Sequence, residues 1–147
     1  MSEISILSAQ FGELSKIVDE VNHAIILLKA QVVKSTQMQD DKVILELDEV
    51  ELEQAIDFMK KFLQRLALLE HPDDHSEQLL PNEAVGQLNK TVIIEIPDFF
   101  GQLHVIQLAI EKHQVLTTSQ LQLLDQVVDA LDQERSELFK KLRAARG

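Results

Sequence analysis

The amino-acid sequence predicts a mainly α-helical protein with four principal helices, packed as a bundle or coiled coil, and a minor β element of two short strands. Three observations lead to this prediction: long runs of apolar residues at helical spacing, two short β-branched segments and a low aromatic content. The 147 residues include six Phe and no Trp or Tyr, so the core must be built from Leu, Ile and Val. Such residues are typical of helix bundles. A chain of this length is expected to form one domain, residues 1–147, around a single core.

The longest predicted helix covers residues 4–34. Eight apolar residues occur there at alternating spacings of four and three: Leu7, Phe11, Leu14, Val18, Val21, Ile25, Leu28 and Val32. A sustained seven-residue repeat is the pattern of helices that pack along one another over many turns. Ile17 and Ala24 widen this apolar face, which favours a bundle of three or four helices over a two-stranded coiled coil.

A short strand is predicted at 42–47, where apolar residues dominate and Glu46 falls in the alternation. A second long helix is predicted at 49–70, with Asp48 placed to cap its first turn. This helix must end before Pro72, which lacks the amide hydrogen needed to continue it. Pro, Asp, Asn and Gly are frequent over residues 71–90, which we interpret as a connection.

The second strand is predicted at 91–96, which is β-branched almost throughout. Two strands alone form a marginal sheet in water, so we expect them to pack on helices, recruit a third strand or pair with another subunit.

Two further helices complete the prediction. One covers residues 98–114, with Asp98 placed as its N-cap. The other covers residues 119–145, with Ser119 as the N-cap and Gln122 three residues later, as in a capping box. Its heptad register is interrupted at Arg135.

The chain is strongly acidic, with a formal net charge of −11. Such a charge repels phosphate backbones and anionic lipids, so we expect no nucleic-acid and no membrane partner. Eight acidic residues lie between Asp40 and Asp57, and the last eight residues carry four basic ones. Helix dipoles favour acids at helix starts and bases at helix ends. A partner-binding patch is the alternative interpretation of the same asymmetry.

The absence of cysteine excludes disulfides, thiolate metal sites and cysteine nucleophiles. The first residues lack the basic start of a signal peptide, and the apolar stretches are much shorter than a membrane span. We therefore expect a cytoplasmic protein.

Two sets of residues have the side-chain types of metal ligands. His71, Asp73, Asp74 and His75 lie close together in the predicted connection and have the donor types that hold divalent ions. The same string is also what a plain helix terminator looks like, so we assign no metal and no cofactor. Glu20 and His23 have the spacing of carboxylate-bridged di-iron bundles. Both fall off the heptad face, however, and the second copy of that motif is missing.

The sequence gives no catalytic residues. It has no Gly-x-Ser-x-Gly motif, and its four glycines are too dispersed for a phosphate-binding loop. No carboxylate pair stands out as a general acid and base.

These observations favour a non-enzymatic protein–protein interaction module, an adaptor or regulatory subunit. We expect it to form a homodimer through the eight heptad residues of 4–34 together with Leu124, Val128 and Leu131. The other expected partner is a second protein of basic character. A chaperone-like escort for a basic or hydrophobic segment is the first alternative, and a small metal-dependent enzyme is the second.

Overall fold

The computed structural model describes residues 3–37, 49–70 and 86–146, apart from the side chains of residues 32–37 and 89. Its elements are α1 (Glu3–Gln37), α2 (Glu49–Ala67) with the 3-10 turn η1 (Leu68–Glu70), the π-helical turn η4 (Asn89–Ile93), α4 (Phe99–Glu111) and α5 (Thr118–Arg146). The prediction of a mainly helical protein is therefore confirmed. The four long helices occupy the positions expected from the apolar periodicity.

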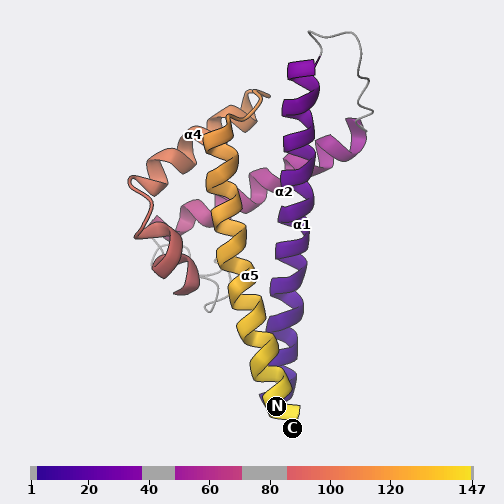
Figure 1. The fold of residues 1–147 in the computed structure, drawn as a ribbon, viewed down its shortest axis with the longest axis vertical. Helices are drawn as coiled ribbons and strands as arrows, with labels where there is room; N and C mark the ends of the chain where they lie inside the picture. Colours follow the sequence, from indigo (N-terminus) through magenta and orange to yellow (C-terminus); the bar gives the residue numbers. More distant parts are fainter. Residues whose placement is uncertain (1–2, 38–48, 71–85, 147) are drawn as a thin grey trace.

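Two long helices, α1 and α5, form the axis of the fold. They lie side by side and antiparallel, so that the two chain termini meet at one end of the molecule (Figure 1). This pair makes the most extensive contact between any two described elements. The heptad face of α1 packs directly on that of α5: Val18, Val21, Leu124 and Leu131 are all fully buried.

The shorter helices cover one side of this pair. Helix α2 crosses behind α1 and α5 in the view of Figure 1, and α4 packs beside it. Met59 and Leu63 of α2 and Leu103 and Ile106 of α4 have no exposed surface. These side chains join those of α1 and α5 in one hydrophobic cluster.

The strand predicted at 91–96 is wrong. The segment forms η4 followed by turns, and Ile96 donates a backbone hydrogen bond to the carbonyl of Val92 at 2.9 Å. The Thr91 hydroxyl likewise bonds the Gln87 carbonyl at 2.8 Å. No strand occurs among the residues that the structure describes, so the segment has no described strand to pair with. Because backbone groups must find partners, helical bonds within the segment outweigh its β propensity. The other predicted strand, 42–47, lies outside the described residues, as does its neighbour Asp48.

Helix α4 begins differently from the prediction. Asp98 precedes it as expected, but its backbone is left-handed, with φ of 50°, and its side chain makes no capping hydrogen bond. The carboxylate lies where a Cβ of Gly101 would be, so it can approach only because that residue is glycine. The entry turn is held instead by Gln102, whose Nε2 donates to the Pro97 carbonyl at 2.7 Å.

Helix α5 begins with a capping box two residues earlier than predicted. The amide of Gln120 donates to Thr117 Oγ1 at 3.1 Å, and the amide of Thr117 donates to Gln120 Oε1 at 2.9 Å. The predicted pair, Ser119 and Gln122, therefore lies inside the helix. The capping box was predicted in the right segment, but residues 117–119 all carry hydroxyl groups, so the sequence did not determine which of them is the N-cap.

Helix α4 ends in a Schellman motif. The amide of Gln114 donates to the Ala109 carbonyl at 2.9 Å, and that of His113 donates to the Ile110 carbonyl at 3.1 Å. The motif requires a left-handed residue, usually glycine, just past the helix. Here His113 takes that position, with φ of 58°.

We predict that Val21→Asp abolishes folding. Val21 is 0% exposed at the centre of the α1–α5 contact. Truncating such a side chain typically costs about 2–5 kcal/mol, and an unpaired buried carboxylate costs more. Thermal unfolding followed by circular dichroism should show no cooperative transition. The neighbouring variant Asn22→Asp, on the exposed side of α1, should melt like the wild type. Normal melting of Val21→Asp would remove this face from the core.

We predict that His113→Gly stabilises the protein by about 1 kcal/mol, because it removes the cost of a left-handed side-chain-bearing residue. The matched change Glu111→Gly, at a right-handed helical position, should destabilise it by up to about 1 kcal/mol. Urea unfolding measures both. A loss of stability in His113→Gly would show that the imidazole makes contacts worth more than the strain.

Candidate functional site

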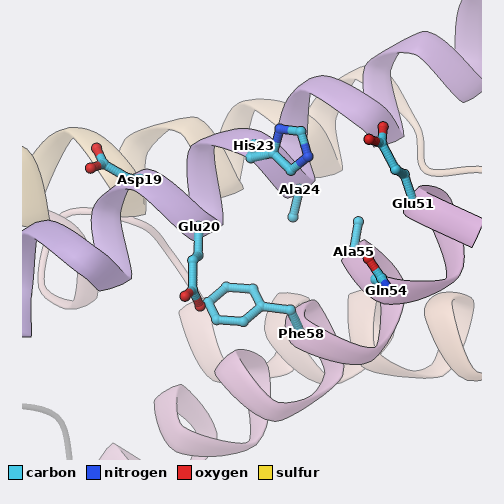
Figure 2. A pocket seen from close by; sticks show the side chains of 8 residues that line it. All are labelled: Asp19, Glu20, His23, Ala24, Glu51, Gln54, Ala55 and Phe58. Atoms are coloured by element: carbon cyan, nitrogen blue, oxygen red, sulfur yellow. The ribbon is translucent and has the colours of Figure 1, made fainter.

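A groove lies between α1 and α2, with a volume of about 420 Å³. Figure 2 shows its walls. Four residues from α1 and four from α2 line it: Asp19, Glu20, His23, Ala24, Glu51, Gln54, Ala55 and Phe58.

The groove exists because small side chains lie where the two helices approach. Ala24 and Ala55 are both buried, and their methyl groups point into the same space in Figure 2. Phe58 forms the apolar end of the cavity. Its ring stacks on Phe62 of the same helix, with 6.4 Å between centroids, so its position is fixed by the core. The floor is thus apolar and preformed.

The rim is acidic. It carries three carboxylates, and its one ionisable nitrogen group is His23, which is exposed. Asp19 already has a partner, because Arg135 of α5 donates to its Oδ1 at 3.0 Å. Glu51 stands at the opposite end, in the first turn of α2. There it lies both near the positive end of the helix dipole and on the rim of the groove.

Glu20 is the distinctive residue of the groove. It is half-buried, and in the view of Figure 2 its carboxylate points toward the ring of Phe58, which lines the same groove. Among the residues that the structure describes, it has no ion-pair or hydrogen-bond partner. A carboxylate held next to apolar surface without a counter-ion loses part of its hydration and gains when a cation arrives.

This arrangement suits a long cationic side chain. The alkyl part of Lys or Arg can lie on Ala24, Ala55 and Phe58 while its charge reaches Glu20. An aromatic ring beside the carboxylate adds a cation–π contact. No lining residue is Ser, Thr or Cys, so the groove itself offers no conventional nucleophile for covalent catalysis.

The predicted interface residues lie inside the chain. Eight of them are buried between helices of the same chain: Leu14, Val18, Val21, Ile25, Leu28, Leu124, Val128 and Leu131. Leu7 and Phe11 are half-buried and pack against the same core. The side chain of Val32 is outside the described set. These side chains, expected to face a second subunit, thus face α5, α1 or the rest of their own core.

Arg135 of α5 is accommodated at the edge of the seam between α1 and α5. Its guanidinium interrupts the heptad register of α5, yet it donates to Asp19 of α1 and to Asp132 one turn earlier. A second link, Lys29 to Asp125 at 2.9 Å, joins the same two helices further along. The interruption is therefore a polar connection at the edge of the seam.

The first set of predicted metal ligands, His71, Asp73, Asp74 and His75, lies outside the described residues. Within the described ranges, no group of three or more His, Asp or Glu side chains is placed to hold a metal ion. Glu20 and His23 do share a site, but it is the groove, with α2 opposite them.

Few features of the sequence predicted this groove. Glu20 and His23 fall outside the heptad face of α1, so they were expected to face solvent. His23 is exposed as expected, but Glu20 is half covered because α2 crosses at that level. Ala24 and Ala55 were the available signal, since small residues on apolar faces permit close helix contact.

No protein-family model, curated protein or solved structure matches this chain. In the described parts of the chain, no helix combines the length and the apolar character that crossing a membrane requires.

Proposed function

We propose that this protein is a non-enzymatic protein-interaction module and that the groove between α1 and α2 holds a basic segment of a partner protein. The observation that supports this most directly is the half-buried Glu20 carboxylate in the same groove as the Phe58 ring. A cation placed there gains a charge-assisted hydrogen bond and an aromatic contact in one position.

The net charge of the whole chain also favours a basic partner segment. A net charge of −11 attracts basic segments over a distance, and it accelerates their association at low salt. The apolar floor of the groove then adds short-range affinity that does not depend on salt. We therefore propose a partner segment in which Arg or Lys alternates with apolar residues.

The second candidate function is that of an escort for a hydrophobic segment. Helix α4 favours it, because its outward side exposes Val105 and Leu108, three residues apart, while its inner side is fully buried. An apolar surface of that kind holds an apolar segment with little sequence preference.

We predict that Glu20→Gln weakens binding of a fluorescein-labelled peptide of alternating Arg and Leu by about tenfold, the effect of losing one charged hydrogen bond. Phe58→Leu keeps the apolar volume and removes the ring face, so it should weaken binding by about two- to fivefold. Fluorescence anisotropy measures both dissociation constants.

The control variant is Glu53→Gln, which changes the net charge by the same amount as Glu20→Gln. Glu53 lies on α2 but does not line the groove. It should bind the peptide like the wild type within about twofold, since exposed charges contribute little. A control peptide with Gln in place of Arg should bind poorly to every variant. Equal loss of affinity in Glu20→Gln and Glu53→Gln would show a diffuse charge effect and overturn the groove as the binding site.

A further inference from the structure

One end of the α1–α5 pair carries only these two helices among the described elements. It is the end where α1 begins and α5 finishes, and α2 crosses the pair nearer to its other end (Figure 1). We call this surface the open end. Six residues define it: Ile4, Leu7 and Phe11 of α1, and Phe139, Arg143 and Arg146 of α5.

The apolar seam is incompletely covered at the open end. Further along α1, the seam residues from Leu14 to Leu28 are between 0% and 3% exposed. Leu7 and Phe11 continue the same heptad row and pack against the core, yet they are only half-buried. The reason is that α2 adds a further layer along the rest of α1, whereas α5 alone lies against this end.

Helix α5 extends the apolar surface. Phe139 is 46% exposed, and its ring centroid lies 5.8 Å from that of Phe11. Ile4, seven residues before Phe11, is 36% exposed. Residues seven apart lie on one side of a helix. Ile4, Phe11 and Phe139 therefore form one apolar strip across two adjacent helices.

Positive charge borders this strip. Residues 3–11 and 137–146 carry four basic side chains and two acidic ones, in a chain whose net charge is −11. Glu137 pairs with Lys140 at 3.4 Å. The Arg143 guanidinium lies over the Phe139 ring, 5.8 Å from its centroid. Neither Arg143 nor Arg146 makes an ion pair with any described residue.

Helix dipoles explain only part of this charge. Basic residues in the last turn of α5 complement the partial negative charge at its end. The start of α1 lies beside that end, however, and brings a partial positive charge of similar size. The two partial charges offset each other, so the arginines leave the open end positive.

We infer that the open end binds an acidic amphipathic helix of a partner protein. The apolar face of that helix lies on Phe139, Phe11 and Ile4, and its carboxylates reach Arg143 and Arg146. The bound helix completes a three-helix bundle at this end, which is the usual way to cover an apolar strip shared by two helices.

Charge and size identify the occupant. A basic helix is repelled by the arginines. A long polyanion or an anionic membrane extends past the open end and meets the strongly acidic remainder of the surface, whereas a single helix contacts the open end alone. The open end lies apart from the groove and has the opposite charge, so this inference does not rest on the proposed function.

The test uses a fluorescein-labelled peptide with Leu at heptad core positions and Glu at the flanking positions. Fluorescence anisotropy with the full chain should give a dissociation constant in the micromolar range. Phe139→Ser should raise it by about tenfold, because an exposed aromatic ring is a typical centre of binding energy. The double variant Arg143→Gln, Arg146→Gln should also raise it by about tenfold. All three residues are exposed, so folding should be kept, and thermal melting verifies it.

Matched variants serve as controls. Ile94→Ser alters a more exposed apolar residue, 77% exposed, in the turn after η4. The double variant Lys61→Gln, Lys141→Gln makes the same charge change on α2 and on another side of α5. Both, and also Glu20→Gln in the groove, should bind the peptide like the wild type within about twofold. Wild-type binding too weak to saturate at millimolar protein overturns the inference, and so does an equal loss of affinity in the controls.

Two other occupants are tested with the same variants. Phosphatidylserine vesicles should not carry the protein into the pellet, and light scattering should give the same molar mass for the wild type and Phe139→Ser. Vesicle binding that the double arginine variant abolishes would make lipid the occupant. A dimer that Phe139→Ser dissociates would make it a second copy. Either result overturns the assignment of an acidic partner helix.

Discussion

The rest of the structure depends on the antiparallel contact between α1 and α5. Its side chains are the fully buried Leu and Val residues that a seven-residue repeat places along one side of each helix. Removing one such aliphatic side chain costs about 2–5 kcal/mol, a large part of the 5–15 kcal/mol that usually separates a folded domain from its unfolded chain. By comparison, exposed ion pairs such as Lys29–Asp125 contribute about 0–1 kcal/mol. The apolar seam therefore holds the pair together, and the ion pairs fix how the helices are aligned.

This contact also decides which surfaces remain available. Because α5 covers the heptad face of α1, the side chains of that face are buried in the core of their own chain. Another side of α1, which forms the groove with α2, is the binding surface in the proposed function. The rim of the groove carries three carboxylates over an apolar floor, which favours a basic partner segment in the proposed function.

Local residue preferences were overruled at three places, by backbone hydrogen bonds at two of them and by backbone conformation at the third. The β-branched segment at 91–96 adopts a helical turn, because its backbone groups bond within the segment. Asp98 precedes α4 without capping it, since its left-handed backbone directs the carboxylate over Gly101. His113 accepts a left-handed conformation because two carbonyls of α4 would otherwise lose their bonds. The sum of backbone bonds and burial outweighs the preference of one residue, which is worth about 1 kcal/mol or less.

The sequence by itself determined the helical character, the approximate extent of the four long helices and the side of each that is buried. These follow from local periodicity, because a side chain's position on a helix depends only on its spacing along the chain. The tertiary structure alone decided that α5 packs along α1, that α2 crosses at the level of Ala24 and Ala55, and that Glu20 and Phe58 line the same groove. Those facts depend on the relative placement of helices far apart in the sequence. That placement is set by how whole surfaces fit together and by links such as Arg135 to Asp19, which leave no periodic signal in the sequence.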